Sequence, residues 1–350
     1  MKLRVVAPLI ILLIFSYLIF VFPFEIISSW LGRSTPLQET ILSTAFVYLA
    51  CLYYFRSKSS NKIIKFFIYE GMGIGTISLF IVIFILSISF VVTISETHKI
   101  FIFLIIFFPL IIFGFLNAKK VSVKHLKFTH SKIKKNYSFI FLSDIHIGSN
   151  SPKILKRLVF LINQQNPSFV LIGGDLIDSS SFKIQDLDEM KNINAPVYFV
   201  TGNHEYYIEE SQKHLNSFKS QNINILDNQS VLIEKINIIG LSDNLNKKDK
   251  IKKFENLYKP DLFNILLVHQ PSIWNVLKEK ANLTLSGHTH NGQIFPFNFI
   301  VKLQFPQIYG VYSHLKNYLY VSSGASTWGP KIRIGSKNEI INIHLSNQND

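Results

Sequence analysis

Cysteine is almost absent from this chain of 350 residues: Cys51 stands alone, inside an apolar segment. A single cysteine excludes a disulfide within the chain and a metal site built from thiolates. Internal repeats and low-complexity linkers are also lacking, which argues against a solenoid. Acidic residues are scarce, 22 against 36 basic ones, so the formal net charge is +14. Much of the lysine lies beside apolar segments or in local runs such as 247–253, so the charge alone does not indicate nucleic acid as a partner.

Apolar residues are in excess: 48% of the chain is hydrophobic and 31 residues are Phe. This is more than an ordinary soluble enzyme carries. The excess of apolar residues lies in the N-terminal third of the chain. Ile, Leu, Phe and Val dominate up to Leu116, whereas from Lys119 onward the apolar runs are short and interrupted by polar residues. We therefore predict a helical membrane domain over residues 1–118 and a hydrolytic domain over residues 119–350.

Four apolar stretches in the first domain are candidate membrane spans. Residues 5–24 have the length of about 20 residues that a helix needs to cross the hydrocarbon core. A cleaved signal peptide is the alternative, but its apolar core would be shorter, and no small-residue cleavage site follows. Residues 71–94 and 100–116 are strong candidates, whereas polar residues dilute residues 37–55. Apart from Glu70 the stretches hold few ionisable residues, which favours anchoring over transport.

The basic residues alternate along this domain as the positive-inside rule expects for four spans. They flank the first stretch, the connection between the second and third, and the end of the fourth: Lys2, Arg4, Arg56, Lys58, Lys62, Lys65, Lys119, Lys120 and Lys124. Four spans place both termini on the cytoplasmic side of a bacterial inner membrane. An odd number would place the hydrolytic domain on the opposite side.

In the second domain, short apolar runs alternate with polar turns and helix-like stretches. The runs are residues 121–128, 139–142, 169–172, 197–200, 236–239, 265–268 and 283–285. Residues 153–165 have helical periodicity and follow Ser151-Pro152. This alternation predicts an α/β fold, with helices on the faces of a sheet and polar chemistry at the carboxyl ends of the strands.

Polar clusters directly follow five of these runs. They are Asp144-Ile145-His146, Gly174-Asp175-Leu176-Ile177-Asp178, Gly202-Asn203-His204-Glu205, His269 and Gly287-His288-Thr289-His290. Each cluster alone is explained by an ordinary polar turn or strand end, but five clusters that each follow an apolar run favour a metal site. Carboxylate, amide and imidazole ligands suit Mn, Fe or Zn. Because residues one apart on a strand project to the same side, we expect Asp144 with His146, and His288 with His290, to reach one centre together.

The order D-x-H, G-D-x-x-D, G-N-H-E, an isolated His and G-H-x-H resembles the calcineurin-like metallophosphoesterases over residues 139–293. The resemblance implies a four-layer α/β/β/α sandwich and two divalent metal ions. It assigns Asp144, His146, Asp175 and His290 to the first metal; Asp175 is shared with the second, which also takes Asn203, His269 and His288. His204 would contact the phosphate and stabilise or protonate the leaving oxygen, with Asp178 as a candidate to orient its ring.

The flanking residues resemble a narrower branch, the bacterial membrane-associated members and the transmembrane protein with metallophosphoesterase domain. They are residues 142–148, residues 287–294 with the sequence GHTHNGQI, and the tail 323–330 with the sequence SGASTWGP, followed by Arg333 and Gly335. Asn291 stands where many members have Gly. Trp328 lies in this tail and receives no role from the sequence.

These features predict a membrane-anchored enzyme that hydrolyses a phosphodiester or pyrophosphate bond by attack of a metal-bridging hydroxide. The membrane domain favours a lipid-linked phosphorylated substrate, and the resemblance makes UDP-2,3-diacylglucosamine one candidate. A non-catalytic scaffold is an alternative, but such a protein would be expected to have lost His204 or a ligand. A nuclease would need a basic cleft that the sequence does not locate. Oligomeric state and the natural substrate stay open.

Overall fold

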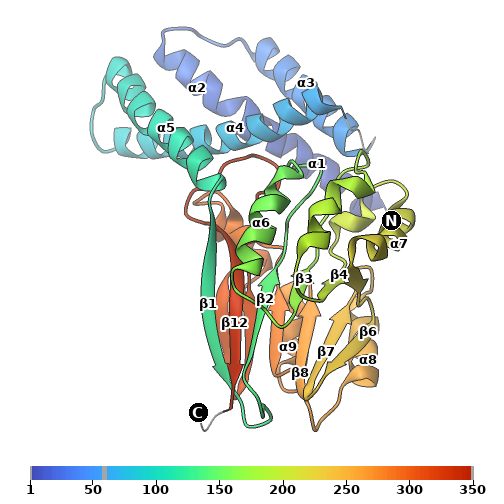
Figure 1. Cartoon of the computed structure of the whole chain (residues 1–350). Helices are drawn as coiled ribbons and strands as arrows, with labels where there is room; N and C mark the ends of the chain where they lie inside the picture. Colours follow the sequence, from blue (N-terminus) through green and yellow to red (C-terminus); the bar gives the residue numbers. More distant parts are fainter. Residues whose placement is uncertain (1, 57–60, 348–350) are drawn as a thin grey trace. The chain divides into compact units, whose positions relative to one another are not determined.

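The computed structural model describes residues 2–56 and 61–347 (Figure 1). The chain divides into two compact units. The helical unit comprises the residues up to Asn117 together with Gly329–Ile334, and the α/β unit comprises Ala118–Trp328 with the residues from Gly335 onward. The sequence grouped Gly329–Ile334 with the hydrolytic domain, whereas in the structure this segment packs with the helices.

The helical unit contains α1 (Lys2–Phe20), α2 (Phe22–Trp30), α3 (Leu37–Arg56), α4 (Lys62–Ser89) and α5 (Glu96–Ala118). Within the described residues, three helical stretches are long and apolar enough to cross a membrane: Val6–Trp30, Ile63–Ser89 and Glu96–Ala118. Helix α3 is not among them, because its first turn contains Gln38, Glu39 and Thr40. The predicted span at residues 71–94 corresponds to Ile63–Ser89, which both begins and ends earlier than predicted. A fourth span through α3 stays a prediction.

The segment Gly329–Ile334 packs against small residues of α4 and α5. The backbone N–H of Arg333 donates to the carbonyl of Gly114 at 3.0 Å, and the Asn117 side chain donates to the carbonyl of Arg333 at 3.1 Å. A Cβ at Gly114 would lie 2.6 Å from a side-chain carbon of Ile332. The glycine therefore lets the segment approach the helix closely.

The described part of the α/β unit contains two six-stranded sheets. The first has the spatial order β1 (Val121–Thr129), β12 (Asn338–Ser346), β2 (Tyr137–Leu142), β3 (Val170–Gly173), β4 (Val197–Val200) and β5 (Ile223–Ile225). The second has the order β10 (Gly310–His314), β11 (Asn317–Val321), β9 (Leu283–Ser286), β8 (Phe263–Val268), β7 (Ile236–Leu241) and β6 (Gln229–Ile233). In Figure 1 the last strand, β12, lies between β1 and β2.

Three apolar layers join these sheets and their helices. Along β8, Ile265 and Leu267 belong to the core between the sheets, while Leu266 and Val268 face the core beneath helices α8 (Lys247–Leu257) and α9 (Trp274–Leu277). Helix α6 (Lys153–Asn163) covers the other sheet and buries five apolar side chains there. Alternation on buried strands thus gives the predicted α/β/β/α sandwich, and the predicted fold class is confirmed.

The parallel strands β2, β3 and β4 in one sheet, and β8 and β9 in the other, end in the loops that carry the polar clusters. The remaining described elements are the α-helices α7 (Ser211–Ser217) and α10 (Asn298–Gln304) and the 3-10 helices η1 (Ile184–Asn192), η2 (His204–Tyr206), η3 (Phe218–Gln221), η4 (Pro271–Ile273) and η5 (His290–Gly292).

Candidate metal centre

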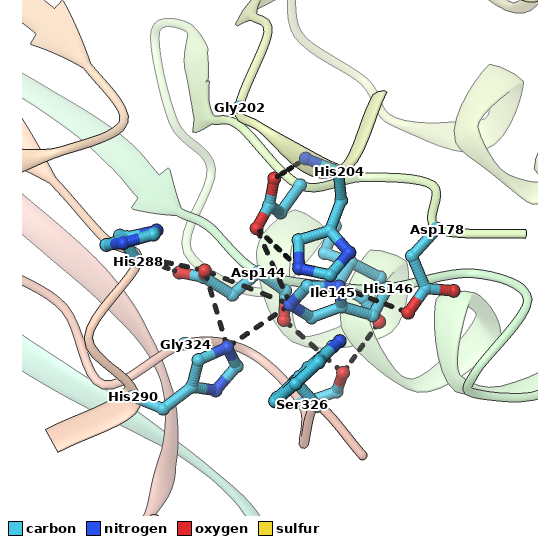
Figure 2. Close-up of polar contacts among 12 residues, drawn as sticks. Asp144, Ile145, His146, Asp178, Gly202, His204, His288, His290, Gly324 and Ser326 are labelled. Carbon is cyan, nitrogen blue, oxygen red and sulfur yellow. Dashed lines mark hydrogen bonds and ion pairs between the residues drawn. The ribbon is translucent and has the colours of Figure 1, made fainter. Parts of the chain in front are cut away.

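The five polar clusters of the sequence meet at the carboxyl ends of the strands. Figure 2 shows how Asp144, His204 and His288, from three of these clusters, lie near one another. The loop after β2 carries Asp144 and His146, and the loop after β3 carries Asp175 and Asp178. Asn203 and His204 follow β4, His269 follows β8, and the loop after β9 carries His288 and His290. Three groups of ligand atoms include every carboxylate and imidazole of these clusters except Glu205, and the atoms within each group lie within 4.8 Å of one another. Two of the groups share His146.

Asp144, His146 and His290 form the first group. The Nε2 atoms of His146 and His290 lie 3.2 Å apart, and Asp144 Oδ1 lies 3.5 Å from His290 Nε2 and 3.9 Å from His146 Nε2. All three residues are buried. One carboxylate oxygen and two imidazole nitrogens thus converge on one small space.

Asp175, His269 and His288 form the second group. Asp175 Oδ2 lies 3.1 Å from His269 Nε2, which lies 3.2 Å from His288 Nδ1. The other ring nitrogen of His269, Nδ1, lies 2.8 Å from the carbonyl oxygen of Gly173. Donation of the Nδ1 hydrogen to that carbonyl leaves Nε2 with its lone pair toward the group.

The Asp175 carboxylate connects the two groups. Its Oδ2 atom lies 3.8 Å from His146 Nε2 in the first group and 3.1 Å from His269 Nε2 in the second. Its Oδ1 atom is held by the backbone N–H of His204 at 2.9 Å. One oxygen is therefore fixed by the backbone while the other faces both groups.

An unusual backbone conformation orients the side chains of five candidate ligands. Asp144, His146, Asp175, His288 and His290 have φ values between +50° and +73°. This left-handed conformation costs about 1–3 kcal/mol for a residue with a side chain, and it gathers at functional sites. It also corrects one expectation. His288 and His290 do not project together, because the chain turns between them and sends His288 to the second group and His290 to the first.

Two glycines make room for the carboxylates. A Cβ at Gly202 would lie 2.2 Å from Asp175 Oδ1, and a Cβ at Gly287 would lie 2.2 Å from Asp144 Oδ2. No larger residue fits either position without displacing a carboxylate.

Glu205 is a site residue that the sequence analysis left without a role. It is fully buried, and its carboxylate accepts the backbone N–H groups of Asp175 at 3.1 Å, Gly202 at 2.7 Å and Ile177 at 3.0 Å. It joins the loops after β3 and β4, which carry Asp175 and Asn203. Its place in the Gly202–Glu205 cluster was the signal available in the sequence.

Asp178 lies against His146. Its Oδ2 atom is 3.3 Å from His146 Nδ1, and its carboxylate accepts hydrogen bonds from the backbone and hydroxyl of Ser149. Asp178, His146 and His204 form the third group of ligand atoms. The contact shown for Asp178 is thus with a candidate ligand, and its predicted role in orienting His204 stays a prediction.

The C-terminal tail braces the Asp144 loop and reaches the His204 ring. The hydroxyl of Ser326 donates to the carbonyl of Ile145 at 2.6 Å, and the N–H of Ala325 donates to the carbonyl of Ser143 at 2.8 Å. Trp328 packs edge-on against the His204 ring at 5.6 Å between ring centroids. The tail motif therefore belongs to the site, although its residues lie far along the chain.

The electrostatics of the site favour bound positive charge. Burial alone would raise the pKa of Asp175, but attraction to His269, His204 and His146 holds it well below its usual range. Burial alone would lower the pKa of His269, but attraction to Asp175 and Asp144 raises it to about 10. Burial and the neighbouring His269 lower the pKa of His288 to about 4. A proton and a metal cation would thus compete for His269 Nε2.

The donor set fits divalent cations. Imidazole nitrogens lie 3.2 Å apart in two places, between His146 and His290 and between His269 and His288. Buried Asn203 Oδ1 has no hydrogen-bond partner among the residues that the structure describes. An uncompensated buried oxygen is costly unless it binds something. The clustered His and Asp residues support a binuclear metal site.

Comparisons with known proteins agree with this chemistry. The family model for calcineurin-like phosphoesterases matches residues 137–292. A metallophosphoesterase of Campylobacter jejuni is 36% identical over 263 residues, covering 69% of this chain and 68% of the relative. A metallophosphoesterase of Helicobacter pylori is 38% identical over 234 residues, covering 62% of each chain. The transmembrane protein with metallophosphoesterase domain of Danio rerio is 30% identical over 268 residues, covering 69% of this chain and 61% of the relative.

The alignments thus span between 61% and 68% of the length of these three relatives. The apolar N-terminal helices, together with a relative named as a transmembrane protein, indicate a membrane protein. The family model includes every polar cluster of the site. The chain therefore belongs to the calcineurin-like metallophosphoesterases, a family of phosphoester hydrolases.

Proposed function

We propose that this protein is a membrane-anchored phosphoesterase that hydrolyses a phosphodiester or pyrophosphate bond at a centre of two divalent cations. The position of Asp175 carries the proposal, because its Oδ2 atom faces both ligand groups. Asp144, His146, His290 and Asp175 would hold one cation. Asp175, Asn203, His269 and His288 would hold the other. The nitrogen and oxygen donors suit Mn, Fe or Zn.

Two bound cations would activate a water molecule at neutral pH and neutralise negative charge on the phosphoryl group. The protein's own residues would position the phosphate and the metal ligands and would protonate the leaving oxygen. His204 is partly exposed, and its Nε2 atom lies 3.9 Å from Asp175 Oδ2, so its ring borders the centre and is open to solvent. We assign it to contact the phosphate and to donate a hydrogen bond or proton to the leaving oxygen. Asp178 and Glu205 would keep His146 and Asp175 in place.

The substrate that we propose is phosphorylated and lipid-linked. The apolar helices support this choice, as does the relative whose name joins a transmembrane protein to a metallophosphoesterase domain. UDP-2,3-diacylglucosamine is one candidate of this class. We do not propose nucleic acid as a substrate.

We propose a bacterial inner membrane as the location, with the α/β unit on the cytoplasmic side. This orientation requires α3 to cross the bilayer with the three more apolar stretches. The basic residues after α5, Lys119 and Lys120, support it through the positive-inside rule.

The test is hydrolysis of bis-p-nitrophenyl phosphate by the purified full chain with Mn²⁺. Replacing a partner that merely orients a ligand costs about 10–100-fold in activity or metal affinity, so we expect Asp175→Asn, which alters a shared ligand, to lose at least about 100-fold. Asp188→Asn is the matched control, because Asp188 is solvent-exposed and pairs only with Lys191 among the salt bridges of the described residues. A fully active Asp175→Asn protein would contradict the assignment of the site.

A further inference from the structure

The α/β unit exposes a concentrated apolar surface beside the metal centre. Among the described residues of this unit, five of the eleven exposed large apolar side chains lie between Phe295 and Leu303. These five are Phe295, Phe297, Phe299, Ile300 and Leu303, and we call them the α10 surface. Phe299 is 61% exposed and Leu303 is 86% exposed. Helix α10 itself buries no residue. Clustered exposure of this kind marks a surface that contacts another apolar phase.

Contacts of residues next to the α10 surface connect this segment to the ligand loop. The ring of Phe305, directly after α10, packs edge-on against the ring of His288 at 4.9 Å between centroids. The hydroxyl of Thr289 donates to the carbonyl of Ile308 at 2.6 Å. A Cβ at Gly292 would lie 2.3 Å from the Cα of Asn298. The segment from His288 to Ile308 is therefore one packed structure with ligands at one end and exposed apolar side chains at the other.

The stretch of sequence that carries this surface contains no acidic residue. No Asp or Glu occurs between Glu279 and Glu339, whereas Lys302 lies within α10 itself. A short helix with Phe and Leu side chains and an exposed Lys is typical of a segment lying in the membrane interface, where the apolar groups enter the acyl region and the amine meets anionic headgroups.

The connection between the candidate span α5 and the α/β unit is short. Helix α5, one of the candidate spans, ends at Ala118, and β1 of the α/β unit begins at Val121. So short a connection would give the α/β unit a high effective concentration at the membrane that holds α5. A lipid surface is therefore the occupant that the covalent structure favours over a separate soluble protein.

We propose that the α10 surface is a lipid-contact surface that inserts into an anionic bilayer and holds the His288–His290 loop at the headgroup level. This inference rests on the proposed function and narrows its substrate class to molecules presented in the membrane interface. The acyl part of such a substrate would stay in the bilayer while its phosphate reaches the metal centre.

The test places a fluorescent label at Leu303→Cys in the full chain, reconstituted in vesicles of phosphatidylcholine and phosphatidylglycerol. The native Cys51 is buried, so unsubstituted protein gives the labelling background. Leu315→Cys is the matched control, because Leu315 is 83% exposed on the hairpin between β10 and β11, outside the α10 surface. We expect brominated lipids to quench the label at position 303 at least twofold more than the label at position 315.

Equal quenching at the two positions would overturn the proposal. A label at position 303 that is shielded from water but not quenched by brominated lipid would also overturn it, because a protein partner or a second copy would then cover the surface. Adding Phe299→Ser and Ile300→Ser should at least halve the quenching at position 303, whereas Leu232→Ser on β6 should not.

Bis-p-nitrophenyl phosphate separates this inference from the proposed function. This small soluble substrate does not require insertion, so the Phe299→Ser, Ile300→Ser protein should hydrolyse it at the unsubstituted rate within about twofold. Loss of quenching with this activity intact would show that the substitutions affect lipid contact and not the metal centre. Absence of this activity in the unsubstituted protein would contradict the proposed function instead.

Discussion

In α3 and α5 of the helical unit, large apolar side chains such as Phe46 and Ile105 are exposed, whereas in the α/β unit Phe141 on β2 and Ile265 on β8 are fully buried. Ionisable side chains are buried in the α/β unit as well, among them Asp144, Asp175 and Glu205. The same chain thus combines a unit that exposes apolar helix faces with a unit that excludes solvent from charges.

This difference shows what each unit needs from outside the polypeptide. Exposed apolar helix faces need the hydrocarbon of a bilayer, which supplies no hydrogen bonds and leaves the helices intact. Buried carboxylates and imidazoles need compensating positive charge, and metal cations supply more of it than protons do. The dependence of the helical unit on a bilayer and the dependence of the α/β unit on metal cations should be separable by experiment.

Metal removal should have the largest effect and should act on the α/β unit alone. A ligand that binds only the folded state at 100 times its dissociation constant contributes about 2.7 kcal/mol per site. Adding a chelator to the Mn²⁺-loaded protein should therefore increase hydrogen exchange in the ends of β2, β3 and β8 while leaving α1, α4 and α5 unchanged. The activity on bis-p-nitrophenyl phosphate should disappear and return with Mn²⁺.

Asp175→Asn is the control for that measurement. Because the substitution alters the oxygen that faces both ligand groups, Mn²⁺ should no longer protect the strand ends in this variant. Protection by Mn²⁺ that is equal in the two proteins would show that the cation acts somewhere other than the proposed centre.

A pair of glycine substitutions sharpens the comparison. In Gly202→Ala the new Cβ would lie 2.2 Å from Asp175 Oδ1 and 2.7 Å from the backbone nitrogen of Asp175, so the carboxylate must move. Displacing a reacting group by about 1 Å can cost on the order of 100-fold in rate. We expect a loss of that size in kcat with bis-p-nitrophenyl phosphate.

In Gly114→Ala the new Cβ would lie 2.6 Å from a side-chain carbon of Ile332, within the helical unit. The change should loosen the packing of Gly329–Ile334, seen as faster hydrogen exchange at Arg333, while kcat with the soluble substrate falls by less than about tenfold. Equal losses in the two variants would mean that the helical packing of this segment controls the metal centre.

The sequence predicted which residues form the site better than how they are arranged. Because Asp144, Asp175, Asn203, His269 and His288 follow apolar runs, their meeting at the carboxyl ends of the strands could be expected. The split between His288 and His290 was implied by the family resemblance but not by strand alternation, since it depends on positive φ values that alternation does not reveal.

Long-range pairing was likewise beyond the sequence pattern. The contacts of Ser326 with the Asp144 loop join residues far apart in the chain, and β12 enters the sheet between β1 and β2 although no local signal names its neighbours. Apolar content predicted the helices of the membrane domain, but the bounds of α4 differ because polar Lys62 and Lys65 are tolerated in its first turn. Composition locates such helices, and packing decides their ends.

Glu205→Gln should have a smaller effect than loss of a ligand. The amide keeps one acceptor oxygen in place of two, while its NH₂ group would face a backbone N–H that now has no acceptor. A buried donor left without a partner costs about 1–3 kcal/mol. We expect a lower midpoint of thermal unfolding and a higher Mn²⁺ concentration for half-maximal activity, with full activity recovered at saturating Mn²⁺. Activity that does not recover would indicate a direct part in the reaction.

The smallest expected effect concerns α3, the helix that decides on which side of the membrane the α/β unit lies. If α3 already crosses the bilayer, replacing Gln38 and Glu39 with Leu only strengthens an existing span, and orientation should not change. If α3 lies outside the hydrocarbon, the added hydropathy should drive it across and move the α/β unit to the other side. Labelling Lys119→Cys with a membrane-impermeant maleimide in intact bacterial cells, before and after the double substitution, distinguishes these cases. We expect no labelling in either protein, because four spans keep this position cytoplasmic; labelling in only one of them would show that α3 does not cross in the native chain.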